Sequence, residues 1–119
     1  MEKALKFKKL GNEQYKNRNY RQAINYYTKA IACQEDHVFY SNRSSCYLAL
    51  HEYKKAIQDG LKAISLKPDF VKAYYKTGKA YKRTGQLENA IDYFKQGLDI
   101  EADPTIRKEL EDSKILNIY

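Results

Sequence analysis

The chain has 119 residues, a net charge of +7, and 43 % hydrophobic against 31 % charged residues, a mixture typical of one globular domain. Five Gly and two Pro are too few for the many tight turns of an all-β sandwich or barrel. The longest apolar run, residues 46–50, is too short for a membrane span or for the apolar core of a signal peptide. Two Cys cannot form a disulfide scaffold, so we expect a reducing compartment, the cytoplasm.

Similar residues recur three times along the chain, at spacings of 33 and then 34 residues. The recurring sets are Phe7, Tyr40 and Tyr74; Gly11, Ser44 and Gly78; Ala23, Ala56 and Ala90; and Ile24, Ile57 and Ile91. A fixed period of this length indicates a stacked repeat architecture, in which each unit buries its apolar face on its neighbours.

Each unit has the pattern of two helices joined by a short turn. In the third unit, residues 71–84 predict one helix, Gly85 marks the turn, and apolar residues then recur at helical spacing. In the second unit, His51 and Glu52 take the place of the Gly turn, and Pro68 separates this unit from the next. We expect a single domain, 1–119, with repeats at about 4–36, 37–70 and 71–103. The 12 Tyr are then mostly core residues that fill the space opposite small residues on a neighbouring helix.

The end of the chain predicts a seventh helix over residues 104–118 that caps the array. Pro104 suits a first helical position, and Asp103 can cap the helix. The residues expected to cover the last helix pair are Ile106, Leu110 and Ile115. Such a cap is required because the final repeat has no neighbour on which to bury its face.

Basic side chains concentrate in the first two thirds of the chain. Residues 1–83 hold 18 basic and 7 acidic side chains, whereas residues 84–119 hold 4 and 8. The helix predicted at 71–84 carries a row of cations on one face, at Lys72, Lys76, Lys79 and Arg83. Like charges in one row repel each other, so the row indicates a site for an anion rather than a merely solvated face.

Polar side chains from three helices are expected to meet on the concave surface. When repeats stack, the first helices of successive units lie side by side. This brings together three ammonium groups and two amides, those of Lys8, Asn12, Asn42, Lys72 and Lys76. Such donors suit a carboxylate, or a short peptide that carries several. The residues expected to flank them in the groove are Tyr15, Ser45, Ala49, Lys79 and Arg83.

A helix–turn–helix unit of about 34 residues with these small and aromatic positions resembles the tetratricopeptide repeat. The first-position Trp of that family is replaced by Phe7, Tyr40 and Tyr74, and the closing Pro survives only as Pro68. The resemblance covers nearly the whole chain. It implies an all-α fold of three tetratricopeptide repeats, stacked as a right-handed α-solenoid with a C-terminal capping helix.

The polar positions also resemble the dicarboxylate clamp of tetratricopeptide co-chaperones, in particular the heat-shock organising protein family. The family pattern, Lys-x-x-x-Asn, then Asn, then Lys-x-x-x-Arg, reads here as Lys8 and Asn12, then Asn42, then Lys72 and Lys76. Only the last position departs, with Lys in place of the family's planar Arg fork. The resemblance implies an adaptor that binds the acidic C-terminal tail of the seventy- or ninety-kilodalton heat-shock chaperones. The choice between these chaperones depends on tail residues upstream of the shared terminus.

Other sequence features point to no further chemistry. Cys33 and His37 have a spacing that can hold a metal, but Cys46 and His51 belong to a different unit. We therefore expect no metal and no cofactor, and both Cys as small core residues. Arg43 is expected to pair between helices rather than to contact the ligand.

Three other functions compete with the adaptor. A nucleic-acid binder could use the net charge of +7 and stack bases on Tyr, but the Tyr residues follow the packing positions rather than the basic row. An enzyme would need a catalytic constellation or a phosphate loop, and the sequence shows neither. A repeat domain that binds an internal acidic motif remains the closest alternative. For the adaptor we expect a monomeric domain without a membrane or nucleic-acid partner.

Overall fold

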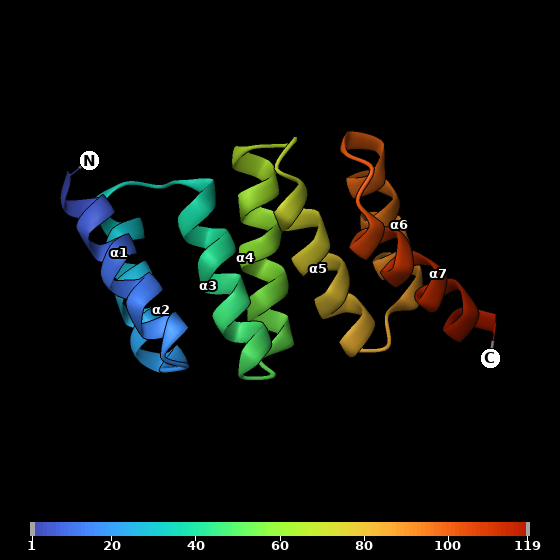
Figure 1. Ribbon diagram of the computed structural model, residues 1–119, viewed down its shortest axis with the longest axis horizontal. Coiled ribbons are helices and arrows are strands. Elements are labelled where there is room, and N and C mark those ends of the chain that lie inside the picture. Colours follow the sequence, from blue (N-terminus) through green and yellow to red (C-terminus); the bar gives the residue numbers. More distant parts are fainter. Residues whose placement is uncertain (1, 119) are drawn as a thin grey trace.

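The computed structural model describes residues 2–118, which fold into helices that follow one another along the long axis of the molecule (Figure 1). The helices are α1 (Glu2–Lys16), α2 (Tyr20–Cys33), α3 (His37–Ala49), α4 (Tyr53–Leu66), α5 (Val71–Arg83), α6 (Leu87–Ile100) and α7 (Pro104–Ile118). No strand occurs in this part of the chain, so the predicted all-α class is confirmed. Each of these helices is too short or too polar to span a bilayer.

The helices form three pairs, α1 with α2, α3 with α4, and α5 with α6, and α7 packs on the last pair. The second helix of each pair also packs on the first helix of the next pair. The first helices α3 and α5 contact each other directly. This arrangement is what allows side chains of α1, α3 and α5 to share one surface.

All three turns within the pairs have the same backbone form. The residues at the equivalent positions, Arg18, His51 and Gly85, have positive φ angles of 62°, 61° and 78°. In each turn, the amide of the residue that follows the positive-φ residue donates a hydrogen bond to a carbonyl in the last turn of the preceding helix. In the second turn, the Glu52 amide donates to the Tyr47 carbonyl at 2.9 Å. The turn predicted at His51 is therefore confirmed, and only the third unit uses the glycine that this conformation favours.

The predicted seventh helix is confirmed, together with its cap. The Asp103 carboxylate accepts hydrogen bonds from the amides of Thr105 at 2.8 Å and Ile106 at 3.2 Å. Ile106 and Leu110 are buried against α6, as predicted. The prediction for Ile115 was wrong, because its side chain is 55 % exposed. Nine residues after Ile106, at about 100° per residue, Ile115 points to the opposite face of the helix.

Close packing within a pair depends on a small residue opposite an aromatic ring. A Cβ atom added to Gly11 would lie 2.6 Å from the ring of Tyr27, and one added to Gly78 would lie 2.5 Å from the ring of Phe94. The prediction that Tyr side chains fill such spaces is confirmed at Tyr27, which is buried. The middle pair is built differently, because there the hydroxyl of Ser44 donates to the carbonyl of Ala56 at 2.8 Å.

The two cysteines have different surroundings. Cys46 is buried in a cluster with Ala23, Ile24 and Tyr27, as predicted for a small core residue. Cys33 is exposed, so the same prediction was wrong there. It is the last residue of α2, at the point where that helix ends.

Replacing Gly78 by Ala should destabilise the protein, although Ala favours the helix by about 1 kcal/mol. The added methyl group forces the Phe94 ring aside, and overpacking of this kind costs about 1–3 kcal/mol. Urea unfolding followed by circular dichroism measures the net loss, with the exposed substitution Asn89→Ala as a control. Phe94→Leu should relieve the clash, so the double variant should be more stable than the sum of the two single losses implies. Strict additivity would contradict the proposed contact.

Candidate functional site

A hollow of about 440 Å³ lies where α1, α3 and α5 face one another. Its lining residues are Asn12, Tyr15, Tyr27, Asn42, Ser45, Lys72, Tyr75 and Lys76. We call it the central hollow. Four of the five residues predicted to bind a carboxylate share it, so three repeats do bring these side chains together. Lys8, one turn before Asn12 on α1, is half-buried and is not among the lining residues.

The amide of Asn12 is held in place before any ligand arrives. Its side-chain oxygen accepts a hydrogen bond from the Tyr27 hydroxyl at 2.6 Å and one from the Asn42 amide at 3.4 Å. Burial raises the pKa of Tyr27, which keeps its hydroxyl protonated as a donor. With its oxygen occupied in this way, Asn12 can offer a ligand only the N–H donors of its amide.

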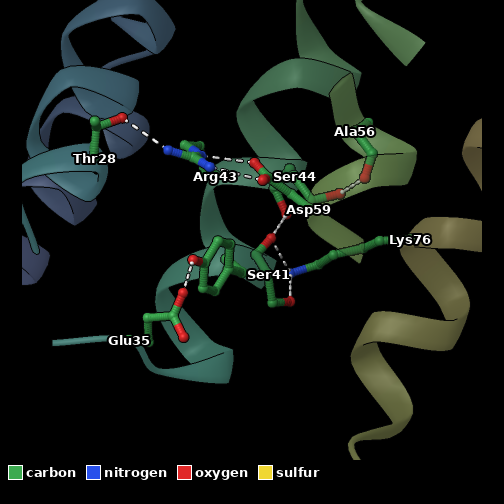
Figure 2. A network of polar contacts seen from close by, with 10 residues as sticks. Thr28, Glu35, Ser41, Arg43, Ser44, Ala56, Asp59 and Lys76 are labelled. Carbon is green, nitrogen blue, oxygen red and sulfur yellow. Dashed lines mark hydrogen bonds and ion pairs between the residues drawn. The ribbon is translucent and has the colours of Figure 1, made fainter. Parts of the chain in front are cut away.

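Hydrogen bonds from Lys76 link α5 to α3 (Figure 2). Its ammonium donates to the hydroxyl of Ser41 at 2.9 Å and to the Ser41 carbonyl at 3.2 Å. Burial, and then the nearby charge of Lys72, lower the pKa of Lys76 from 10.5 to about 8. An ammonium has three donors, so one N–H remains for a ligand in the hollow.

Arg43 lies outside the lining of the hollow and is engaged by protein groups, as Figure 2 shows. Its guanidinium donates two hydrogen bonds to the carboxylate of Asp59, at 2.7 and 2.8 Å, and a third to the hydroxyl of Thr28 at 3.1 Å. The predicted role between helices is therefore confirmed, since these contacts join α3 to α4 and to α2.

A second hollow of about 400 Å³ continues the groove toward the end of α5. We call it the basic-end hollow, and its lining residues are Tyr15, Ser45, Leu48, Ala49, His51, Tyr53, Tyr75, Lys76, Lys79 and Arg83. All five residues predicted to flank the groove line it. A third hollow of about 260 Å³, the acidic-end hollow, is lined by Val71, Lys72, Tyr75, Glu101, Asp103, Thr105 and Ile106.

The sequence reasoning did not predict a site role for Tyr75, Tyr27 or Ser41, which line the hollows or hold side chains that line the hollows. Tyr75 lines all three of them, and it could have been found because it stands three residues after Lys72, on the same helix face. Tyr27 was assigned to packing alone, and Ser41 was not considered. No sequence signal identifies either as a polar partner, because their contacts join different helices.

No metal centre is formed by the described residues. Between residues 2 and 118, no group of three or more His, Cys, Asp or Glu side chains is placed to hold an ion. Burial raises the pKa of Cys46 to about 12, which keeps its thiol protonated and a poor ligand or nucleophile.

The comparisons with known proteins identify the repeats. Residues 1–78 match a family model described as "Serine/threonine-protein kinase BSK1-like, TPR repeats", and residues 71–104 match one described as "Tetratricopeptide repeat". The chain belongs to the tetratricopeptide repeat family. It is 37 % identical over 100 residues to the Heat shock protein sti1 homolog of Schizosaccharomyces pombe. That alignment covers 83 % of this chain, which spans only 17 % of the relative's length.

Two solved structures share the whole arrangement of helices. The first TPR domain of Spaghetti (RPAP3), bound to the HSP90 peptide SRMEEVD, is 29 % identical with a TM-score of 0.97, over 99 % of this chain and 95 % of that one. The second TPR domain of human RPAP3, in complex with the HSP70 peptide SGPTIEEVD, is 31 % identical with a TM-score of 0.91, over 94 % and 95 %. The predicted resemblance to co-chaperone repeats is therefore confirmed.

The lowered pKa of Lys76 makes stability depend on pH. Between about 8 and 10.5 the unfolded chain binds the Lys76 proton more tightly than the folded chain, so the free energy of unfolding rises with pH in this range. Lys76→Met removes this dependence. Relative to the variant, the wild type should gain about 1 kcal/mol from pH 7 to pH 9, measured by urea unfolding. The exposed Lys95→Met serves as the control, and equal pH profiles for wild type and Lys76→Met would contradict the assignment.

Proposed function

We propose that this chain is a binding module that holds the acidic C-terminal tail of a heat-shock chaperone by its free carboxylates. The observation that carries the proposal is the convergence of Asn12, Asn42, Lys72 and Lys76 on one hollow from three helices. These side chains present donors and positive charge, and a terminal Asp offers two carboxylates to the same few ångströms. Binding requires no chemistry beyond this recognition, so the proposed role is that of an adaptor and not of an enzyme.

The charge of the central hollow is not neutralised within the described structure. Among residues 2–118, no carboxylate lies within ion-pair distance of Lys72 or Lys76. An anionic ligand would supply the missing charge, and each charge-assisted hydrogen bond contributes about 1.5–3 kcal/mol. Three or four such contacts, less the cost of ordering a flexible tail, correspond to micromolar affinity, or about −8 kcal/mol.

The site is built in advance of binding, which favours recognition of a flexible tail. Tyr27 orients the Asn12 amide, and Ser41 holds the Lys76 ammonium, so these side chains lose little freedom when a ligand arrives. Lys8 belongs to the proposal as a flexible cation at the edge, able to swing over a carboxylate already bound by Asn12.

The relatives support the identity of the tail. Both solved structures named above are TPR domains in complex with peptides that end in EEVD. We extend this ligand class to the present chain because four positions of the proposed clamp carry matching donors. We also propose one monomeric domain with repeats at about 4–36, 37–70 and 71–103, acting in the cytoplasm, where its two free cysteines stay reduced.

The first test is whether the ligand's terminal carboxylate is required. Isothermal titration should show that SGPTIEEVD binds, and that the same peptide with a C-terminal amide binds at least tenfold more weakly. Lys72→Ala should cost about 1–3 kcal/mol of binding free energy while leaving the fold intact, since Lys72 is exposed. Lys95→Ala removes the same charge far from the groove and controls for long-range electrostatics. Equal affinity for the acid and the amide would instead support binding of an internal acidic motif.

Affinity should also depend on the protonation of Lys76. A bound carboxylate favours the ammonium form, so the peptide should bind about three- to tenfold more weakly at pH 9 than at pH 7.5. Titrations at the two pH values measure the change, and Lys76→Met should remove most of it. If the variant shows the same pH dependence as the wild type, Lys76 does not contact the ligand.

A further inference from the structure

The groove continues beyond the proposed clamp in two directions, and its two ends carry opposite charge. The basic-end hollow includes Lys79 and Arg83, whereas the acidic-end hollow includes Glu101 and Asp103. Both ends adjoin the central hollow, which they share through Tyr75. A tail whose terminal residue sits in the central hollow can continue along either of them, and an acidic tail is attracted to the basic end and repelled by the other.

The cations of the basic-end hollow have no acidic partner in the described chain. Among residues 2–118, no carboxylate lies within ion-pair distance of Lys79 or Arg83. Lys82, on the same turn but outside the hollow, is paired with Glu109 at 3.1 Å. On α5, the cations without an ion-pair partner among the described residues are therefore Lys72, Lys76, Lys79 and Arg83, and each of them lines one of the hollows.

An aromatic side chain in the wall of this hollow holds Lys79 in place without neutralising it. The ammonium of Lys79 lies 5.2 Å from the centre of the Tyr75 ring, a cation–π contact that leaves the full positive charge. Two other lining residues, His51 and Tyr53, are joined by a hydrogen bond of 2.6 Å between ring nitrogen and hydroxyl. A shaped, cationic hollow of this kind suits a single acidic side chain.

The geometry of α5 sets where along the tail that side chain must be. Arg83 follows Lys72 by 11 residues, or about 16 Å along a helix, and an extended peptide covers this distance in about five residues. From these observations we infer that the basic-end hollow is a second anion-recognising subsite. It takes an acidic side chain about five residues before the terminal aspartate and selects against a tail with a basic residue there. This inference rests on the proposed function, because the clamp fixes the position of the terminal residue.

The fifth residue before the terminal aspartate of the peptide can be changed while the terminal residues stay the same. In SGPTIEEVD the fifth residue before the terminal Asp is Thr. We use three peptides that differ only there, with Thr, Glu or Lys, each prepared as the free acid and as the C-terminal amide. At low salt, the wild-type chain should bind the Glu peptide about three- to tenfold more tightly than the Lys peptide, with the Thr peptide between them.

Variants assign this preference to the hollow. Arg83→Gln combined with Lys79→Gln should bring the Glu and Lys peptides to within about twofold of each other, while the preference for the free acid over the amide remains. Lys82→Gln removes a charge from the same helix outside the hollow, and it should keep the wild-type preference. Circular dichroism confirms that each variant is folded.

The outcomes separate the two proposals. If the wild type binds the Glu and Lys peptides equally but still requires the free terminal carboxylate, the second subsite is wrong and the clamp stands. A preference that survives in the Arg83→Gln and Lys79→Gln protein also overturns the subsite. If no peptide binds, or if amides bind as well as acids, the proposed function fails, and the inference fails with it.

Discussion

The architecture depends on how closely the two helices of each pair approach each other. In the first and third pairs, an aromatic ring lies directly over a glycine, where even one added carbon atom would clash. In the middle pair, a buried serine hydroxyl takes over by bonding the backbone of the facing helix. These contacts fix the distance within a pair, and the pairs then stack so that α1, α3 and α5 present side chains to one groove. This packing determines where the proposed clamp donors of the central hollow lie. Each of these donors is carried by the first helix of a pair, and the contact with the second helix of that pair sets the position of the first.

The charges of the groove reduce the stability of the folded chain. It gathers cations that no described carboxylate neutralises, and it buries Lys76 enough to lower its pKa to about 8. By contrast, the same chain pairs Arg43 with Asp59 and Lys82 with Glu109 at positions outside the hollows. On α5, the cation outside the hollows is paired, whereas the cations that line the hollows have no carboxylate partner among the described residues. Unfavourable electrostatics concentrated in one concave surface are characteristic of a binding site, where the ligand supplies what the fold lacks.

The sequence predicted the features that depend on periodicity and local chemistry. The repeats, the turn at His51 and the Asp103 cap each follow from residue types at short range. The prediction that Ile115 is buried was wrong because it followed from the apolar side chain alone and not from the helix face that the residue occupies. The hydrogen bonds between Lys76 and Ser41 join residues 35 positions apart and could not be predicted. They depend on the rotamers of two side chains and on the distance between α3 and α5, which only the packed structure determines.

The contact between Lys76 and Ser41 also explains why Lys fits at a position where the dicarboxylate-clamp pattern has Arg. A guanidinium is a planar fork that binds two carboxylate oxygens at once, and it needs open space on one side. Here the residue is mostly buried, and within the described part of the chain it donates to the hydroxyl and carbonyl of Ser41. The compact ammonium of Lys fits that corner and keeps a third N–H donor in addition to the two that Ser41 accepts. Under the proposed function, α5 would therefore offer the ligand less directional hydrogen bonding than a guanidinium gives, and the amides of Asn12 and Asn42 would set more of the geometry. On the same proposal, the cations of the central hollow would act mainly through their charge, and Lys79 and Arg83 further along α5 would then contribute to ligand choice in the same way.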